Sequence, residues 1–427
     1  MRLPDTPTPT PVEPRHGGAH ALRALRHGNY RWYFVGQAIS VIGTWVQQVA
    51  LSWLIYRLTG SAVLLGVTAL ASQAPQLVIG PFAGIWIDRH DRRRLLLLLQ
   101  VFLLSQALVL AALTYAKIIA PWHIVAMSLL LGVMNSFDAP LRQSLVKQLV
   151  TERSDLPSAI ALNSALYNTG RFVGPPIAGL LVGLSSEAFC FAVNSLSYLP
   201  LIFALTRARV EPNPRSQGAF AAVLREGIAY ALSSYPIRSL LGLIAVLNFT
   251  ASSYVVLMPV FARDVFHGGA TTLGWLLGAA GLGSISAAIY LATRHSVVGL
   301  VKSIVIGASL AATALLLFSL TRRLEFALAL LLLVGFGTTI CNASGNTILQ
   351  TIVPDHLRGR ILSFYTAAVF GMAAVGSMAA GELADAFDAP RALRLLAFAL
   401  LAGAGVFAMR LGELRGRLGT LVASLPL

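Results

Sequence analysis

Apolar runs and short polar breaks alternate along the chain from residue 31 to residue 409. Each run is close to the roughly 20 residues that a helix needs to cross a bilayer. Charged residues, Pro and Gly divide the runs into twelve predicted membrane helices. The predicted ranges are 31–57, 62–87, 95–116, 122–149, 157–184, 187–206, 237–261, 271–292, 302–320, 325–349, 359–384 and 391–409. The pattern predicts an all-α, polytopic membrane protein.

Composition agrees with a membrane protein. Hydrophobic residues make up 56% of the 427 residues and charged residues only 11%, whereas a soluble domain carries roughly a quarter charged residues. The net charge of +15 would indicate a nucleic-acid partner in a soluble protein. Here the charges lie in the breaks between apolar runs, so we expect no nucleic-acid partner. The two cysteines, Cys190 and Cys341, lie inside apolar runs, and we expect no metal and no cofactor.

The distribution of Lys and Arg predicts the orientation. If both termini lie on one side of the membrane, 24 of the 32 basic residues fall on that side and 7 on the other, with Arg171 left inside a helix. Basic residues concentrate on the cytoplasmic side of membrane proteins. We therefore expect both termini in the cytoplasm and the protein in the cytoplasmic (inner) membrane of a bacterium.

Two helical halves are predicted on either side of a polar linker. We expect a disordered, Pro- and Thr-rich cytoplasmic tail at 1–30, a six-helix bundle at 31–206, a cytoplasmic linker at 207–236, a second bundle at 237–410 and a tail at 411–427. Apolar residues at helical spacing in the linker, Phe220, Val223, Leu224, Ile228 and Leu232, predict a surface amphipathic helix. QSLVKQLVTE (143–152) and NTILQTIVPD (346–355) occupy the same loop of each half. Such parallel repeats are typical of transporters, with the substrate site between the halves.

The stretch GPFAGIWIDRHDRRRLL, residues 80–96, concentrates charge between the second and third helices. It resembles the loop motif G-x-x-x-D-R-x-x-R-R of the major facilitator superfamily, matched by Gly84, Asp88, Arg89, Arg92 and Arg93. The resemblance implies a fold of two pseudo-symmetric six-helix bundles. It also implies a conformational latch formed by these residues, to which Arg142 is a candidate addition. The alternative is that these charges only set the topology.

The fifth predicted helix contains NTGRFVGPPIAG, residues 168–179. Gly170, Gly174, Pro175 and Gly179 resemble the motif that exporters of the superfamily carry here. Residues 135–179 are similar to one branch, which includes the enterobactin exporter, macrolide efflux proteins and secretion effectors. The resemblance implies export, although glycine and proline also serve ordinary packing in membrane helices.

Two ionisable residues lie inside predicted helices. Asp138 and Arg171 have similar depths in consecutive helices, which predicts that they pair, because an unpaired charge in a membrane is costly. The pair is either an element that couples export to proton entry or a static bridge. Arg142, one turn after Asp138, is a second candidate partner for Asp138 or for Asp88.

On family grounds the substrate cavity is lined by the first, fourth, seventh and tenth helices. We expect it to include two aromatic residues and seven amides, namely Trp45, Tyr254, Gln37, Gln47, Gln48, Asn135, Asn248, Asn342 and Asn346. Each amide can instead join two helices. Few charges in such a cavity suit a bulky, lipophilic or neutral substrate.

The sequence thus predicts a secondary active transporter that exports a siderophore, macrolide or other drug-like solute, with protons as the coupling ion. The alternative is a lipid or lysophospholipid flippase, or another non-export member of the same fold. An ATP-driven pump is not expected, because none of the three lysines, Lys117, Lys147 and Lys302, follows a glycine as in a nucleotide-binding loop. The protease motif H-E-x-x-H is absent from the sequence. We expect a monomer surrounded by membrane lipid, and no enzyme.

Overall fold

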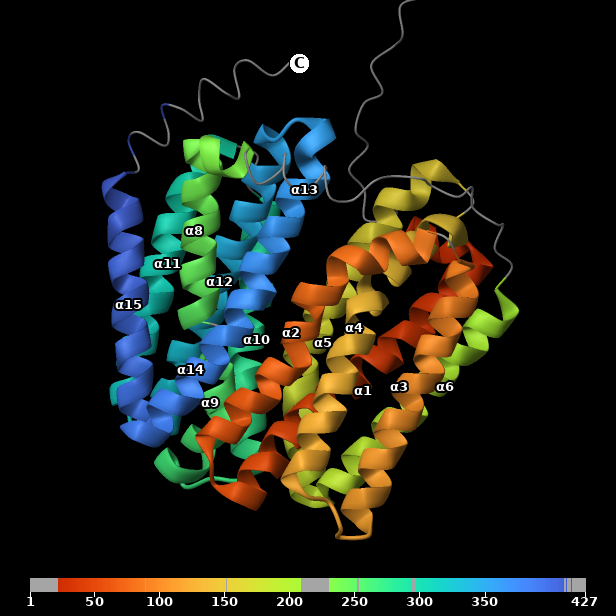
Figure 1. Ribbon diagram of the computed structural model, residues 1–427, viewed down its shortest axis with the longest axis horizontal. Helices are drawn as coiled ribbons and strands as arrows, with labels where there is room; N and C mark the ends of the chain where they lie inside the picture. The colour runs from red at the N-terminus through yellow and green to blue at the C-terminus, as the bar shows by residue number, and fades with distance from the viewer. Residues whose placement is uncertain are drawn as a thin grey trace, which may run out of the picture.

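The computed structural model describes residues 22–88, 90–150, 152–208, 230–251, 253–293, 297–410, 412 and 416. The described part of the chain is helical throughout, with no strand. Helices α1 to α6 pack together as one bundle and α8 to α15 as another, side by side (Figure 1). This is the fold class that the sequence predicts.

The first bundle consists of six long helices. They are α1 (Gly28–Thr59), α2 (Ala62–Asp88), α3 (Arg92–Tyr115), α4 (Pro121–Leu149), α5 (Leu156–Leu184) and α6 (Glu187–Arg207). Short 3₁₀ turns at Arg23–Arg26 and Arg153–Asp155 precede α1 and α5. We call the end of the molecule at which α1 begins and α15 ends the terminal end, and the opposite end, where α1 gives way to α2, the distal end (Figure 1).

The second bundle has two segmented helices. Its elements are α8 (Tyr235–Thr250), α9 (Tyr254–Val260), a π turn (Phe261–Val265), α10 (Ala270–Ala292), α11 (Val297–Leu320), α12 (Leu324–Ile352), α13 (Asp355–Thr366), a π turn (Ala367–Gly371), α14 (Met372–Ala386) and α15 (Ala389–Met409). The predicted seventh helix, 237–261, is therefore interrupted after Thr250, and the predicted eleventh, 359–384, contains a π turn. Pro259 inside α9 and the two π turns are recognised causes of such irregularity.

Eleven described segments are long and apolar enough to cross a membrane. The remaining predicted span is the fifth, 157–184, which corresponds to α5. It is a helix of 29 residues, but its mean hydropathy is lower than that of the other eleven segments. Its first 16 residues include Asn163, Ser164, Asn168 and Arg171, which lower its mean hydropathy. The polar half of α5 borders the cavity described below.

Local chemistry sets the helix ends. Gly60 ends α1 in the left-handed region, at φ 63°, which glycine adopts without strain. Asp91 caps α3 by accepting hydrogen bonds from the backbone N–H groups of Arg93 and Arg94, at 2.9 and 3.1 Å. Ser186 does the same for α6, accepting from Phe189 N at 3.2 Å.

Residues 22–30, within the predicted tail at 1–30, make defined contacts with the first bundle. Ala24 and Tyr30 are fully buried, and the Tyr30 hydroxyl donates to Ala159 O at 3.0 Å. His27 Nε2 lies 3.0 Å from Asp155 Oδ2. These contacts attach the start of α1 to the start of α5, so the prediction of disorder is wrong for residues 22–30. The surface helix predicted near 220–232 falls largely on 209–229, outside the described residues.

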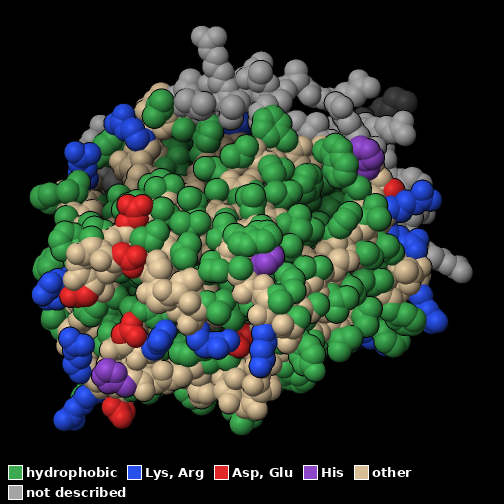
Figure 2. Space-filling model, turned by 60° about the horizontal axis from the view of Figure 1, so that its bottom comes forward, with side chains coloured by type: hydrophobic (Ala, Val, Ile, Leu, Met, Phe, Trp, Pro, Cys, Tyr) green, Lys and Arg blue, Asp and Glu red, His purple; other side chains and the backbone are tan. Residues whose placement is uncertain are grey.

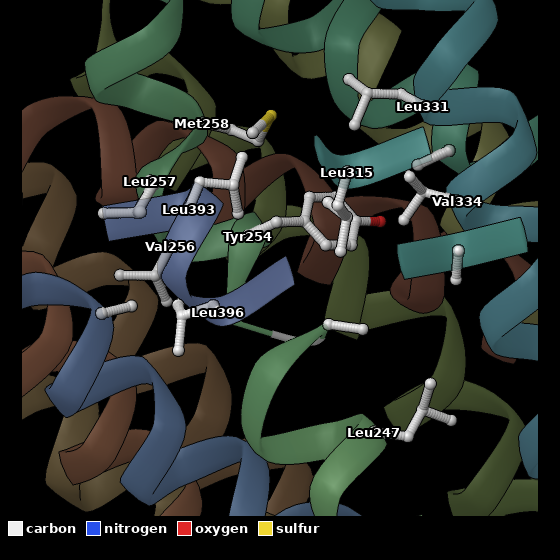
Figure 3. Close-up of a cluster of buried hydrophobic side chains, with 14 of the residues drawn as sticks. Leu247, Tyr254, Val256, Leu257, Met258, Leu315, Leu331, Val334, Leu393 and Leu396 are labelled. Atoms are coloured by element: carbon white, nitrogen blue, oxygen red, sulfur yellow. The ribbon is translucent and has the colours of Figure 1, made fainter. Parts of the chain in front are cut away.

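Hydrophobic side chains fill the interior and also cover much of the outside. In the second bundle the core includes Leu247, Leu257, Leu315, Leu331 and Leu396, which belong to the same buried cluster as Tyr254 (Figure 3). On the outside, hydrophobic side chains dominate the visible face and charged side chains lie mainly in patches toward its margins (Figure 2). An apolar exterior on long helices is what lipid surroundings require.

Candidate functional site

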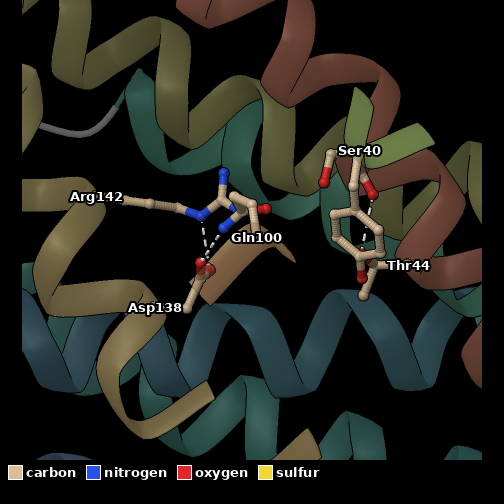
Figure 4. Close-up of polar contacts among 6 residues, drawn as sticks. Ser40, Thr44, Gln100, Asp138 and Arg142 are labelled. Carbon is tan, nitrogen blue, oxygen red and sulfur yellow. Dashed lines mark hydrogen bonds and ion pairs between the residues drawn. The ribbon is translucent and has the colours of Figure 1, made fainter. Parts of the chain in front are cut away.

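A buried ion pair lies in the terminal half of α4. Arg142 Nε is 2.6 Å from Asp138 Oδ2, one helical turn away (Figure 4). Gln100 of α3 donates to Asp138 Oδ1 at 3.1 Å, and its Oε1 accepts from Arg142 Nη2 at 3.4 Å. The predicted pairing of Asp138 with Arg171 is therefore wrong. Residues four apart on a helix face each other, so Arg142, the second candidate, reaches Asp138 first.

The guanidinium of Arg142 is not fully satisfied. Its side chain is only 5% exposed, and Nη1 has no hydrogen-bond partner among the described residues. The Tyr33 hydroxyl of α1 is also buried and interacts with this guanidinium, although the geometry falls short of a full hydrogen bond. Buried polar atoms are nearly always hydrogen-bonded, and a small adjustment or one water molecule would join these two neighbouring groups.

A cavity of about 390 Å³ opens beside this ion pair, between the terminal halves of α4 and α5. Its walls are mostly apolar and also carry two cations and several neutral polar groups. The lining residues are Ala139, Arg142, Gln143, Val146 and Lys147 of α4 and Ile160, Asn163, Ser164 and Tyr167 of α5. Asn163, Ser164 and Tyr167 were not among the residues predicted from the sequence. Their spacing of three and four residues is the signal that could have found them, since it places them on one helical face.

Arg171 lies on α5 one turn after Tyr167, on the same face as the cavity wall. Its side chain is exposed, and it makes no hydrogen bond or ion pair with any described residue. It interacts electrostatically with Tyr254 of α9. Arg171 thus places an unpaired cation between the two bundles.

Several amides predicted to line the cavity join helices instead. Gln47 donates to Gln106 Oε1 at 3.0 Å and accepts from Asn194 Nδ2 at 2.7 Å, which links α1, α3 and α6. Asn248 Nδ2 donates to Asn342 Oδ1 at 3.0 Å, which links α8 to α12. For Gln47, Asn248 and Asn342 the structure supports the helix-joining alternative in this conformation.

The remaining predicted cavity residues lie in different environments. Tyr254 is 3% exposed and lies in the hydrophobic core (Figure 3). Gln37 is fully buried near the ion pair, whereas Gln48 is exposed. Asn135 and Asn346 are half-buried, and Asn346 Oδ1 accepts from Gln350 Nε2 at 3.0 Å. The structure does not gather the predicted set into one cavity.

The glycine motif of α5 lies where three helices meet. A Cβ atom on Gly174 would come within 2.3 Å of Trp45 Cβ on α1, and one on Gly170 within 2.5 Å of Val41 Cγ1. On the opposite face, Gly179 and the carbonyl of Pro175 pack against Gly274 of α10, where a Cβ would meet backbone at 2.7 Å. The motif therefore brings backbone of the two bundles into direct contact.

The bundles are also joined at the distal end by polar contacts. The Tyr56 hydroxyl of α1 donates to Asp264 Oδ2 in the second bundle. Asp385, near the end of α14, accepts from the backbone N–H of Ala62 at 2.9 Å and from the Ser61 hydroxyl at 3.2 Å. Ala62 is the first residue of α2, so a carboxylate of one bundle caps a helix of the other. We call the contacts of Asp264 and Asp385 the distal closure.

The loop motif lies at the terminal end. α2 ends at Asp88 and contains Gly84, but the side chain of Asp88 lies outside the described part, as does Arg89 entirely. Arg93 donates from Nε to Leu205 O at 2.6 Å and from Nη2 to Thr206 O at 2.5 Å. Arg93 thus binds the last carbonyls of α6 within its own bundle. Arg92 is half-buried at the start of α3.

Comparisons with known proteins agree with this architecture. The model of the family described as transmembrane secretion effector matches residues 19–416. The staphyloferrin A transporter of Staphylococcus aureus is 24% identical over 88% of this chain and 95% of its own. The multidrug efflux pump Tap of Mycolicibacterium fortuitum is 26% identical over 87% of this chain and 93% of its own.

Solved structures share the fold at low sequence identity. A bacterial homologue of the iron transporter ferroportin, in an inward-facing state, has a TM-score of 0.69 at 16% identity and covers 91% of this chain and 99% of its own. An inward-facing, occupied bacterial homologue of the lysosomal transporter Spinster has a TM-score of 0.68 at 13% identity, over 93% and 97%. The family match spans nearly the whole chain, and this protein therefore belongs to the transmembrane secretion effectors of the major facilitator superfamily.

Proposed function

We propose that the protein exports a small organic solute across the bacterial cytoplasmic membrane by alternating access. The observation that carries the proposal is the asymmetry between its ends. The bundles are held together at the distal end, whereas a cavity lined by α4 and α5 lies in the terminal half. With both termini in the cytoplasm, as the basic residues predict, this is an inward-facing conformation ready to accept a solute from the cell interior.

Relatives favour export of a sizeable, drug-like or metal-chelating solute. One is a staphyloferrin A transporter and another a multidrug efflux pump, and a macrolide efflux protein of Streptococcus pyogenes is 23% identical over 57% of this chain. The glycine motif of α5 resembles that of exporters of the superfamily, and it packs the bundles against each other on the distal side.

Proton coupling is assigned in this proposal to the Asp138–Arg142 pair, in place of Asp138–Arg171. Asp138 has 16% of its side chain exposed beside the cavity, so protons can reach it from the terminal end. Protonation would remove the charge that holds Arg142 Nε, and a buried arginine released from its carboxylate must find another partner. Such a two-state element is what coupling requires.

The opposite conformation would be latched by the loop motif. Asp385 caps the first residue of α2 at the distal end. Asp88 is the last residue of α2, and α13 of the second bundle lies at the terminal end, where it begins at Asp355 (Figure 1). We propose that Asp88, with Arg89 and Arg92, binds the start of α13 when the terminal end closes. Each end of α2 would then carry one of two alternating closures.

Export is tested in bacteria that lack their own exporters. Accumulation of a siderophore, a macrolide and a lipophilic dye is measured with wild type, Asp138→Asn and an empty vector, with and without a protonophore. The proposal predicts lower accumulation with wild type, restored by the protonophore and by Asp138→Asn. Unchanged accumulation of all three solutes by well-expressed wild type would contradict it, and lipid movement between leaflets would then be the function to measure.

A further inference from the structure

The charges around the terminal cavity are unbalanced. Helices α1, α5, α8 and α10 contain no Asp or Glu, and α12 contains only Glu325, in its first turn. In α4 the one acid is Asp138, already bound to Arg142 and Gln100. Against it stand Arg142 and Lys147 in the cavity wall and Arg171 one turn deeper along α5. The region therefore carries a net positive charge.

Asp138 and Gln100 do not occupy all the donors of Arg142, whose Nη1 is buried beside the Tyr33 hydroxyl. Asp138 holds Nε and Gln100 holds Nη2, whereas Nη1 makes no full hydrogen bond to a described residue. A guanidinium has five N–H donors in a planar fork that suits carboxylate and phosphate oxygens. An anion in the cavity that Arg142 lines is therefore attracted by the guanidinium while Asp138 keeps Nε, and it gains Nη1 when the neighbouring Tyr33 hydroxyl moves aside.

Arg171 supplies a second cation for the same ligand. It follows Ile160, Asn163, Ser164 and Tyr167 at helical spacing on the α5 face that forms the wall, and no described carboxylate pairs with it. An unpaired arginine inside a membrane helix is costly unless a water-filled cavity or a ligand compensates it. Tyr167, which is 41% exposed, and Asn163 add neutral hydrogen-bonding groups between the two arginines.

We propose that the exported solute carries an anionic oxygen group, such as a carboxylate, which binds in this cavity between Arg142 and Arg171. The inference rests on the proposed export function and names the chemistry of its substrate. It replaces the expectation of a neutral substrate, which depended on amides that the structure uses to join helices. Arg171 becomes a binding residue for the solute, and Arg142 a residue shared between the solute and Asp138.

The test measures the charge preference of the cavity directly. Ser164, exposed in the wall, is changed to cysteine after the buried Cys190 and Cys341 are replaced by alanine. The purified protein in neutral-lipid nanodiscs is treated with an anionic and a cationic methanethiosulfonate of similar size. The readout is the rate of modification by the anionic reagent divided by the rate for the cationic one, normalised to the same ratio for a small free thiol.

The proposal predicts a normalised ratio well above one. Arg171→Gln should lower this ratio about fivefold, because a unit charge within about 10 Å changes the local potential by that order. Arg171→Lys, which keeps the charge, should stay within about twofold of wild type. The matched control is Arg322→Gln, at an exposed arginine between α11 and α12 at the distal end, which should leave the ratio unchanged. A wild-type ratio near one, or equal ratios for wild type and Arg171→Gln, would overturn the site.

Two further arms separate the possible failures. The ratio is measured again in nanodiscs that contain phosphatidylglycerol, to test whether an anionic lipid headgroup is the ligand. If the ratio falls to one only in these nanodiscs, the lipid headgroup occupies the site and the assignment to a solute is overturned. Dye accumulation in cells is measured with the same variants. A high ratio without export by wild type would contradict the proposed transport function but support the anion site. Export with a ratio near one would support the transport function but contradict the anion site.

Discussion

At the residue scale, Asp138 and Arg142 depend on each other. Both side chains are largely buried, at 16% and 5% exposure, and their ion pair at 2.6 Å is supported by Gln100. Removing one partner of a buried pair leaves the other charge uncompensated, while removing both is far less costly. The ion pair therefore stabilises the conformation described here, independently of any role during transport.

This dependence predicts a strongly non-additive pair of variants. Arg142→Gln should lower the free energy of unfolding by about 3–5 kcal/mol, and adding Asp138→Asn should recover most of that loss. Thermal unfolding of the purified protein in detergent measures both. If the double variant is no more stable than Arg142→Gln, the ion pair is not what stabilises this region.

Gln47 offers a contrast, because its contacts are all structural. It bonds Gln106 and Asn194 and is 2% exposed. Gln47→Leu removes a hydrogen bond from both partners and should cost about 1–3 kcal/mol of stability. The same variant should leave the ranking of exported solutes unchanged. If Gln47→Leu changes the ranking of solutes in the accumulation assay at equal expression, Gln47 lines the substrate cavity after all.

At the element scale, the break between α8 and α9 is stabilised from outside. Gly376 of α14 lies so close that a Cβ atom would be 2.0 Å from Phe249 O and 2.6 Å from Ser253 Oγ. The Ser253 hydroxyl itself donates to Phe249 O, which occupies a carbonyl near the end of α8. Segmented helices of this kind are common at the substrate sites of transporters.

Gly376→Ala should therefore separate α14 from α8 and destabilise the second bundle by about 2–4 kcal/mol, as overpacking against backbone does. Gly405 in α15 is the matched control, because nothing lies within 4 Å of an added Cβ there. Gly405→Ala should be neutral or stabilising by up to about 1 kcal/mol. Equal melting temperatures for the two variants would contradict the close contact.

The helices were predictable wherever the properties of a single segment decide the outcome. Twelve apolar runs predicted their positions within a few residues, because span length and apolar character are local properties. The segment around Thr250 packs tightly against Gly376, which belongs to a helix much later in the chain, and no local pattern encodes that contact. Likewise, His27 and Tyr30 are ordered by residues at the start of α5, whereas the sequence before them is typical of a tail.

The candidate site was predictable only in part, for a similar reason. Depth along the helices placed Asp138 and Arg171 at one level, but depth does not fix the direction of a side chain. Helical spacing favours Arg142 for Asp138, and the face of α5 carries Arg171 toward the cavity. An amide likewise looks the same in sequence whether it faces a cavity, as expected of Gln47, or bonds two other amides.

At the scale of the whole molecule, the two bundles meet through the distal closure and the glycine contacts of α2, α5, α10 and α14. Gly66 packs against Ser377 and Gly381 against Ala62, with Cβ positions 2.8 and 2.5 Å from carbonyl oxygens. The conformation is therefore maintained by backbone proximity together with the polar contacts of the distal closure. Changes at the distal closure should shift the equilibrium between conformations more than they change stability.

Asp385→Ala removes the cap that the second bundle provides for α2. Loss of about 1–1.5 kcal/mol of hydrogen bonding should raise the population of the distal-open conformation about tenfold. Distances between spin labels on the two bundles at the distal end measure that population. Ser186→Ala is the control, since Ser186 caps α6 within its own bundle. An equal change in both variants would show that the Asp385 cap does not act between the bundles.

The central claim, alternating access by a solute exporter, is tested most directly by locking the distal end. Ser61 and Asp385, whose side-chain oxygens are 3.2 Å apart, are replaced by cysteines in a protein whose Cys190 and Cys341 have been changed to alanine. Export from cells is then measured before oxidation, after oxidation and after reduction, beside each single-cysteine variant. The account predicts that the crosslink abolishes export and that reduction restores it, while oxidation leaves export by both single variants unchanged. Full export with the distal ends crosslinked would contradict alternating access.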